Sequence, residues 1–314
     1  MFSDCQHAPR DAQSVPARES SMPYAVAGVS DGSALAHQDP TSRAGSVAPA
    51  LRHWAALIHE HTGLPTRPMY VAAQDAEDLS AGLRGLSPDI GVIVLICTDP
   101  AHYSAANGSA PGWGSQRPVV TDSAMAAAAA TAALLTTLNR RGLSPERSRV
   151  VIAGATTMPV LRSLLLAAGL GRVISWDRRD TVTFPLHRII RNAEAVIDLL
   201  GCARELAEIA SDNPELIIIT PDKASWALLA LPALLHAVAT AQDPTAGVKC
   251  YHACALALAA NTPPDRQLPD PMEPALPSTV EQTATRAPSP ARSCESVDPY
   301  VRAGDDDDNQ EPRR

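Results

Sequence analysis

A loop that could hold phosphate groups follows an apolar run in the middle of the chain. Residues 150–153 predict a buried strand, residues 159–168 predict a helix, and the sequence GATTMP at 154–159 joins them. In a G-x-G-x-x-G loop the first glycine makes the turn, the second admits a pyrophosphate and the third lets the helix pack closely. The first position is kept, but Thr156 and Pro159 occupy the second and third. We expect a weakened nucleotide site lined by Gly154, Ala155, Thr156 and Thr157.

The acidic residue that follows the next predicted strand could complete this site. Residues 173–176 predict that strand, and Asp177 follows it directly. An acidic side chain at this place accepts hydrogen bonds from ribose hydroxyls and favours NAD over NADP. The alternative is an ordinary strand-end carboxylate beside Arg178 and Arg179. Both readings remain open.

Two aspartates lie at the ends of predicted elements. Asp99 follows the apolar run 91–97, and Asp122 begins an alanine-rich stretch, 122–139, that predicts a long helix. By their places alone, Asp122 would be a helix N-cap and Asp99 part of a strand-end turn.

The cysteines do not indicate a zinc site. The chain has six, without a C-x-x-C pair, and Cys250, His252 and Cys254 form the densest group. A zinc site needs three or four ligands, and no second cluster follows. We therefore expect Cys250 and Cys254 to be thiols buried on a helix.

Strand and helix patterns alternate along most of the chain, which predicts an α/β fold. The expected strands are residues 24–29, 68–72, 91–97, 150–153, 173–176, 195–199 and 216–220. The expected helices are residues 54–61, 76–85, 122–139, 159–168, 202–210, 224–239 and 247–259. The C-terminal half therefore indicates a Rossmann-type, doubly wound parallel sheet with helices on both faces.

Composition limits the partners and the compartment. The formal net charge is −8, partly from the run at 305–308, and no basic stripe is present, so we expect no nucleic-acid partner. No apolar stretch reaches the roughly 20 residues of a membrane helix, and the N-terminus has no signal-peptide core. We expect a cytoplasmic protein. Residues 1–21 predict a disordered arm and residues 263–314 a disordered, proline-rich acidic tail.

Several segments, in order, resemble the malic enzymes, the NAD(P)-dependent decarboxylating malate dehydrogenases. Residues 150–155, 164–169 and 176–179 (VVIAGA, LLLAAG, WDRR) are similar to the family's VVxNGAGAAG, LLLAAG and CDRKG elements. The SDGSA at 30–34 resembles TDGTA, and the TD at 121–122 with its alanine-rich helix resembles the DDQHGT segment. Residues 88–100 are similar to the segment that ends in the family's Glu-Asp metal pair, and 230–235 to AFPGIFRGALD.

The resemblance covers residues 24–260 and implies a domain organisation. Residues 22–121 would form a truncated N-terminal-like domain, and residues 122–262 the NAD(P)-binding, Rossmann-like domain. It also implies NAD, a nucleotide or small carboxylic acid as ligand, and a homodimer. Asp99 and Asp122 match two of the three metal-binding positions of the family, so the resemblance implies a site for Mg²⁺ or Mn²⁺, which two carboxylates alone would bind weakly.

The catalytic positions that the resemblance implies have changed. Trp54 stands where the family has its lysine base, the motif of the tyrosine acid is missing, and Thr98 replaces the metal-binding glutamate. Residues Thr220–Ala227 run directly into the segment similar to AFPGIFRGALD, so a block of about twenty residues between the family's two asparagine segments is deleted, and the substrate-binding asparagines are missing. We therefore assign no catalytic residue and expect a pseudoenzyme without malate decarboxylation. The alternatives are an active NAD-dependent oxidoreductase with an altered site, and an interaction module that presents its acidic tail.

Overall fold

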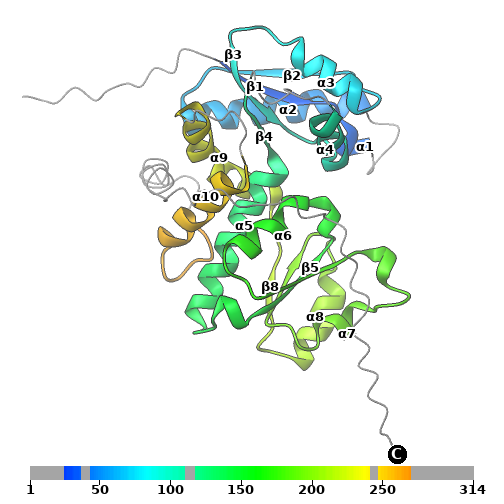
Figure 1. Ribbon diagram of the computed structural model, residues 1–314, viewed down its shortest axis with the longest axis vertical. Coiled ribbons are helices and arrows are strands. Elements are labelled where there is room, and N and C mark those ends of the chain that lie inside the picture. The colour runs from blue at the N-terminus through cyan, green and yellow to red at the C-terminus, as the bar shows by residue number, and fades with distance from the viewer. Residues whose placement is uncertain (1–24, 37–42, 110–116, 241–246, 270–314) are drawn as a thin grey trace, which may run out of the picture.

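Two parallel sheets form the framework of the computed structural model, which describes residues 25–36, 43–109, 117–240 and 247–269. Each sheet has four strands, in the orders β2-β1-β3-β4 and β6-β5-β7-β8. They lie at opposite ends of the molecule with helices between them (Figure 1). The α/β class expected from the sequence is confirmed.

The first sheet lies in the N-terminal half of the chain. Its strands are β1 (Ala25–Ser30), β2 (Thr66–Tyr70), β3 (Ile90–Leu95) and β4 (Val119–Thr121). Its helices are α1 (Ser33–Ala36), α2 (Arg43–Thr62), α3 (Ala76–Arg84) and α4 (Pro100–Ser109).

The second sheet follows after the long helix α5 (Asp122–Arg140). Its strands are β5 (Arg149–Ala153), β6 (Arg172–Trp176), β7 (Ala195–Asp198) and β8 (Ile217–Ile219). The remaining helices are α6 (Pro159–Ala167), α7 (Leu186–Ile190), α8 (Ala203–Asp212), α9 (Lys223–Thr240) and α10 (Val248–Ala260).

Side chains alternate along the strands, so each sheet is covered by helices on both faces. Val92 and Val94 of β3 pack in the same cluster as α2, while Ile93 and Leu95 face α3. In the second sheet, the face toward α5 and α6 belongs to the large central core, and the other face packs on α7 and α8. One apolar core therefore connects the two sheets through α5.

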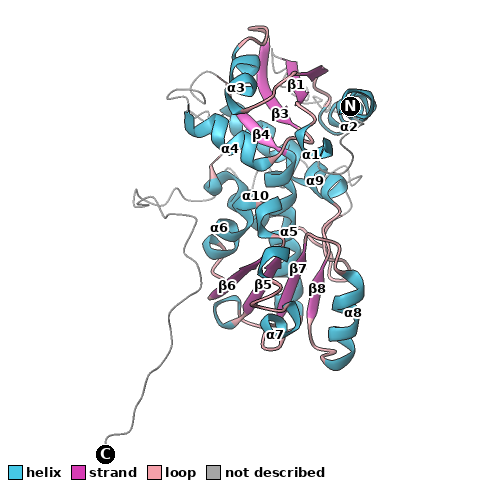
Figure 2. Cartoon of the chain, turned by 90° about the vertical axis from the view of Figure 1, so that its right-hand side faces the viewer, coloured by secondary structure: helices cyan, strands magenta, loops and turns pink. Residues whose placement is uncertain are grey.

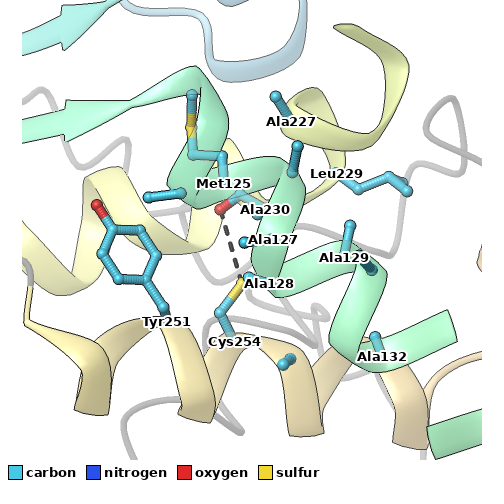
Figure 3. Packing of buried hydrophobic residues seen from close by; sticks show 14 of the residues in the cluster. Met125, Ala127, Ala128, Ala129, Ala132, Ala227, Leu229, Ala230, Tyr251 and Cys254 are labelled. Atoms are coloured by element: carbon cyan, nitrogen blue, oxygen red, sulfur yellow. Dashed lines mark hydrogen bonds between the residues drawn. The ribbon is translucent and has the colours of Figure 1, made fainter. Parts of the chain in front are cut away.

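Helix α5 is buried because its residues are small. Residues 126–130 are five alanines without exposed surface, which lets α9 and α10 pack close against α5. Figure 3 shows Tyr251 and Cys254 of α10 on the side that faces α5, with the Cys254 thiol 3.8 Å from the Ala230 carbonyl oxygen. α5, α9 and α10 lie between the two sheets, as the turned view also shows (Figure 2).

Most differences from the expected elements lie at element ends, but five are substantive. α1, β4, α4 and α7 were not predicted, and α2 begins eleven residues earlier than expected, at Arg43 rather than Trp54. The N-cap of α5 is Thr121, whose hydroxyl accepts from the amide of Ala124 at 3.1 Å; Asp122 is already helical. The predicted arm lies outside the described residues, as does the predicted tail beyond Pro269.

Candidate functional site

Strand order creates one crevice at each sheet. In an open parallel sheet, ligands bind beyond the carboxyl ends of two neighbouring strands whose connections leave toward opposite faces. β1 and β3 form such a pair in the first sheet, and β5 and β7 form it in the second. We call them the first crevice, after β1 and β3, and the second crevice, after β5 and β7.

The turn of the predicted phosphate loop at the second crevice requires glycine. Gly154 has φ +93°, and its amide donates to the Trp176 carbonyl oxygen at 2.7 Å. A β-carbon on Gly154 would lie 2.7 Å from Cγ of Leu200 and 3.3 Å from Cβ of Leu199. The Leu200 side chain, which follows β7, therefore packs directly on the turn.

The other predicted cofactor residues make contacts among themselves. Thr156 donates its hydroxyl to Oδ1 of Asp177 at 3.0 Å, and Thr157 donates to the Gly154 carbonyl oxygen at 2.9 Å. Asp177 also forms a capping box with Asp180, whose Oδ2 accepts from the Asp177 amide at 3.0 Å. Asp177 thus lies at the place predicted for a ribose acceptor and also caps its own turn.

A dinucleotide fits this loop only in part. Gly154 keeps the turn, but Thr156 brings a branched side chain to the position where backbone should approach a pyrophosphate. The Thr156 hydroxyl is already donated to Asp177. We therefore derive no hydride-transfer step through a bound nicotinamide, and cofactor binding by Gly154, Ala155, Thr156, Thr157 and Asp177 stays a prediction.

Sequence reasoning missed a buried carboxylate beside this loop. Asp198, the last residue of β7, is 2% exposed and pairs in register with Ala153 of β5. Its Oδ1 accepts from the Leu200 amide at 3.0 Å, while Oδ2 has no hydrogen-bond partner among the described residues. Burial raises the pKa of the nearby Cys202 thiol, and Asp198 adds to the rise. The sequence signal that could have revealed it is that the apolar run 195–197 is followed directly by an acidic residue.

The predicted metal ligands lie at the first crevice, where backbone amides contact them. Asp122 accepts from the Cys97 amide on Oδ2 at 2.9 Å and from the Ser123 amide on Oδ1 at 2.6 Å. Asp99 accepts from the Ala101 amide on Oδ1 at 2.7 Å. In the described part of the chain, no group of three or more His, Cys, Asp or Glu side chains could hold a metal ion. Metal binding by Asp99 and Asp122 is therefore not confirmed and stays a prediction.

The first crevice contains a second polar group that the sequence did not reveal. The side chain of Asp31 has no exposed surface, and its Oδ2 lies 3.0 Å from Nδ1 of His102 on α4. Its Oδ1 accepts from the Ser33 amide at 3.0 Å and from the Ser33 hydroxyl at 2.7 Å. Cys97 precedes His102 closely in the sequence. It is the one non-glycine residue with a positive φ, 52°, among the described residues.

Cys254 of α10 is buried in the packing between the sheets, as expected, whereas Cys250 on the same helix is only half-buried. Cys254 is buried, and burial raises the pKa of its thiol to about 12. Burial likewise raises the pKa of Tyr251 on the same helix, while the Thr121 backbone opposes the rise. Both side chains therefore stay protonated at neutral pH. No helix in the described residues is long and apolar enough to span a membrane.

The fold is that of the malic enzymes. Among solved structures, the chain is similar to an NAD-dependent malic enzyme from Thermotoga maritima, with a TM-score of 0.69 and 18% identity over 84% of each chain. It is similar to a malic enzyme from Pyrococcus horikoshii, with a TM-score of 0.66 and 17% identity over 83% of this chain and 75% of that one. It is also similar to the Entamoeba histolytica malic enzyme, with a TM-score of 0.66 and 16% identity over 83% of this chain and 69% of that one.

These likenesses establish the architecture. No protein-family model and no curated protein matches the chain. At 16–18% identity, the structural neighbours do not transfer their reaction.

Proposed function

We propose that this chain is a malic-enzyme-like protein that no longer oxidises and decarboxylates malate. The observation that carries the proposal is the burial of Trp54. By the sequence resemblance it stands at the lysine base, and it is 6% exposed in the apolar core with Leu51 and Ile58 of the same helix. An indole can donate a hydrogen bond but cannot accept the proton that malate oxidation releases. α2 uses this position for packing instead.

Thr98 supports the same proposal at the metal position. It occupies the place of the family's glutamate, is buried, and its hydroxyl lies 3.5 Å from the Ile96 carbonyl oxygen. A neutral hydroxyl gives a divalent ion much less stabilisation than a carboxylate does. Decarboxylation of a 2-oxo acid in this family depends on such an ion as electron sink, so we propose that this step is lost as well.

A weakened NAD site is the ligand-binding function that we propose to remain, with a small carboxylic acid as the other candidate ligand. Gly154 supports it, because the left-handed turn after β5 is retained. Asp177 supports it through its position at the end of β6. Thr156 and the packing of Leu200 oppose tight binding. A homodimer, expected from the resemblance, stays a prediction that light scattering can check.

Thermal shift with each candidate ligand tests this proposal. Because a ligand that binds only the native state stabilises it by RT ln(1 + [L]/Kd), a weak NAD site should raise the melting temperature appreciably only when the NAD concentration approaches a high Kd. Thr156→Gly restores the second glycine and removes the bond to Asp177, so its NAD-induced shift should exceed that of the wild type. Thr157→Gly, one residue away, is the matched control and should not gain affinity. Equal NAD shifts for the wild type and both variants would contradict the proposed weakening.

A further inference from the structure

The loop and short helix between β6 and β7 present a group of arginines to solvent. Residues 178–191 contain four arginines and His187 but a single carboxylate, that of Asp180. The arginines and His187 are all exposed. α7 lies on the face of the second sheet that points away from α5, at the end of the molecule opposite the first sheet (Figure 1). We call the group formed by Arg178, Arg179, Arg188 and Arg191 the arginine surface.

Hydrogen bonds hold the backbone of the arginine surface together. The Trp176 indole donates to the Phe184 carbonyl oxygen at 2.8 Å, and the Phe184 amide donates to the Asp180 carbonyl oxygen at 2.7 Å. The chain that leaves β6 is thereby folded back toward the start of α7. On α7, Arg188 and Arg191 are three residues apart and therefore share one side of the helix.

The arginine surface has no acidic partner within the described ranges. None of its four guanidinium groups forms an ion pair there, and Arg178 donates to a neutral group, the Leu200 carbonyl oxygen, at 3.4 Å. The neighbouring carboxylates are engaged elsewhere, because Asp180 accepts from the Asp177 amide and Asp177 accepts from the Thr156 hydroxyl. Guanidinium groups bind carboxylates through paired, charge-assisted hydrogen bonds, so this surface fits an acidic segment.

The same loop exposes apolar side chains. Val182 is 95% exposed and Phe184 is 49% exposed. Aromatic and arginine side chains are enriched together at protein interfaces. The composition of this surface therefore favours a polypeptide as its partner.

The C-terminal segment of this sequence has the complementary charge. Its run of four aspartates, residues 305–308, is the densest group of carboxylates in the chain. Residues 270–304 connect this run to Pro269, the last described residue, and at about 3.3 Å per residue a segment of this length extends up to about 115 Å. A domain of about 100 residues has a radius of gyration of only about 13 Å. The aspartate run is therefore connected by enough chain to reach the arginine surface of its own molecule.

We propose that residues 305–308 bind the arginine surface of the same chain. The connection through residues 270–304 makes this binding intramolecular and raises the effective concentration of the run, so that exposed ion pairs that are weak singly act together. The bound run neutralises Arg178 and Arg179, which directly follow Asp177, and thereby opposes the binding of other anions beside the second crevice. This goes beyond the proposed function and does not depend on whether malate is turned over.

Chemical modification of arginines by phenylglyoxal, measured residue by residue with mass spectrometry on the full-length protein, tests the proposal. A first variant combines Asp305→Asn, Asp306→Asn, Asp307→Asn and Asp308→Asn, and a second changes the same four positions to glutamate. At low salt the arginine surface should react several-fold more slowly in the wild type and in the glutamate variant than in the asparagine variant. Arg204 on α8, whose side chain is 97% exposed, is the internal control and should react equally in all three proteins.

Salt and dilution complete the test. High salt should abolish the difference in reaction rate, because it screens exposed ion pairs. Dilution should leave the difference unchanged, because binding within one chain does not depend on the protein concentration. Equal rates at the arginine surface in the wild type and the asparagine variant would overturn the proposal. Protection that is lost on dilution would overturn it as well, since the aspartates would then bind a second copy of the chain.

Discussion

Replacing Gly154 by alanine tests the packing of the second crevice most sharply. A left-handed φ of +93° costs alanine about 1–2 kcal/mol. The added Cβ would also lie 2.7 Å from Cγ and 2.8 Å from Cδ2 of Leu200, well inside the usual carbon–carbon contact of about 3.5–4.0 Å. Overpacking of this kind costs about 1–3 kcal/mol, so Gly154→Ala should destabilise the protein by about 2–5 kcal/mol.

Gly169→Ala is the matched control, because φ is +86° there and nothing lies within 4 Å of the added carbon. It should cost only the conformational part, about 1–2 kcal/mol. Urea unfolding of both variants gives the difference directly, provided that the m-value is unchanged. Adding Leu200→Ala to Gly154→Ala should remove the excess. If the two glycine variants were equally destabilised, Leu200 would not fill the space above the turn and the crevice would be open.

Three further outcomes follow from the packing and the titrations. Ala128 of α5 has no exposed surface, so Ala128→Leu should lower the free energy of unfolding by at least about 1–3 kcal/mol. Asn139→Leu, on the exposed end of the same helix, should change this free energy little. Equal effects of the two substitutions would contradict the burial of α5. Because burial raises the pKa of Cys254 from 9.0 to about 12, the unfolded state loses this proton first, so stability should fall as pH rises from 9 to 12 and fall less in Cys254→Ala. Asp177→Ala should cost about 0.5–2 kcal/mol in a urea titration through its lost capping box, and no change would show that the box is not stabilising.

The repeating apolar patterns were sufficient to predict the α/β class, whereas the malic-enzyme-like architecture was predicted from the resemblance. Residues 150–153 predicted a strand because a strand that is buried on both faces requires continuous apolar sequence. The alanine-rich residues 122–139 predicted a helix because alanine favours the helical conformation. β4 was missed since it has only three residues, and α4 was missed since its sequence, PAHYSAANGS, lacks a clear apolar face. The cap of α5 was placed one residue late because Thr121 and Asp122 both suit that position.

The candidate site was predictable only where one local segment forms it. The turn at Gly154 and the acid at Asp177 follow from strand-to-loop order. The pair of Asp31 and His102 lies 71 residues apart in the chain, and only the neighbouring positions of β1 and β3 bring it together. Asp198 was missed for the same reason, since its place beside Ala153 depends on β7 pairing with β5.

Malate turnover is the most direct test of the central claim. The full-length protein with malate, Mn²⁺ and either NAD or NADP should form no reduced cofactor above the rate without protein, because Trp54 and Thr98 replace the base and a metal ligand. A malate-dependent rate that is lost in Asp122→Asn would contradict this account and establish an active malic enzyme.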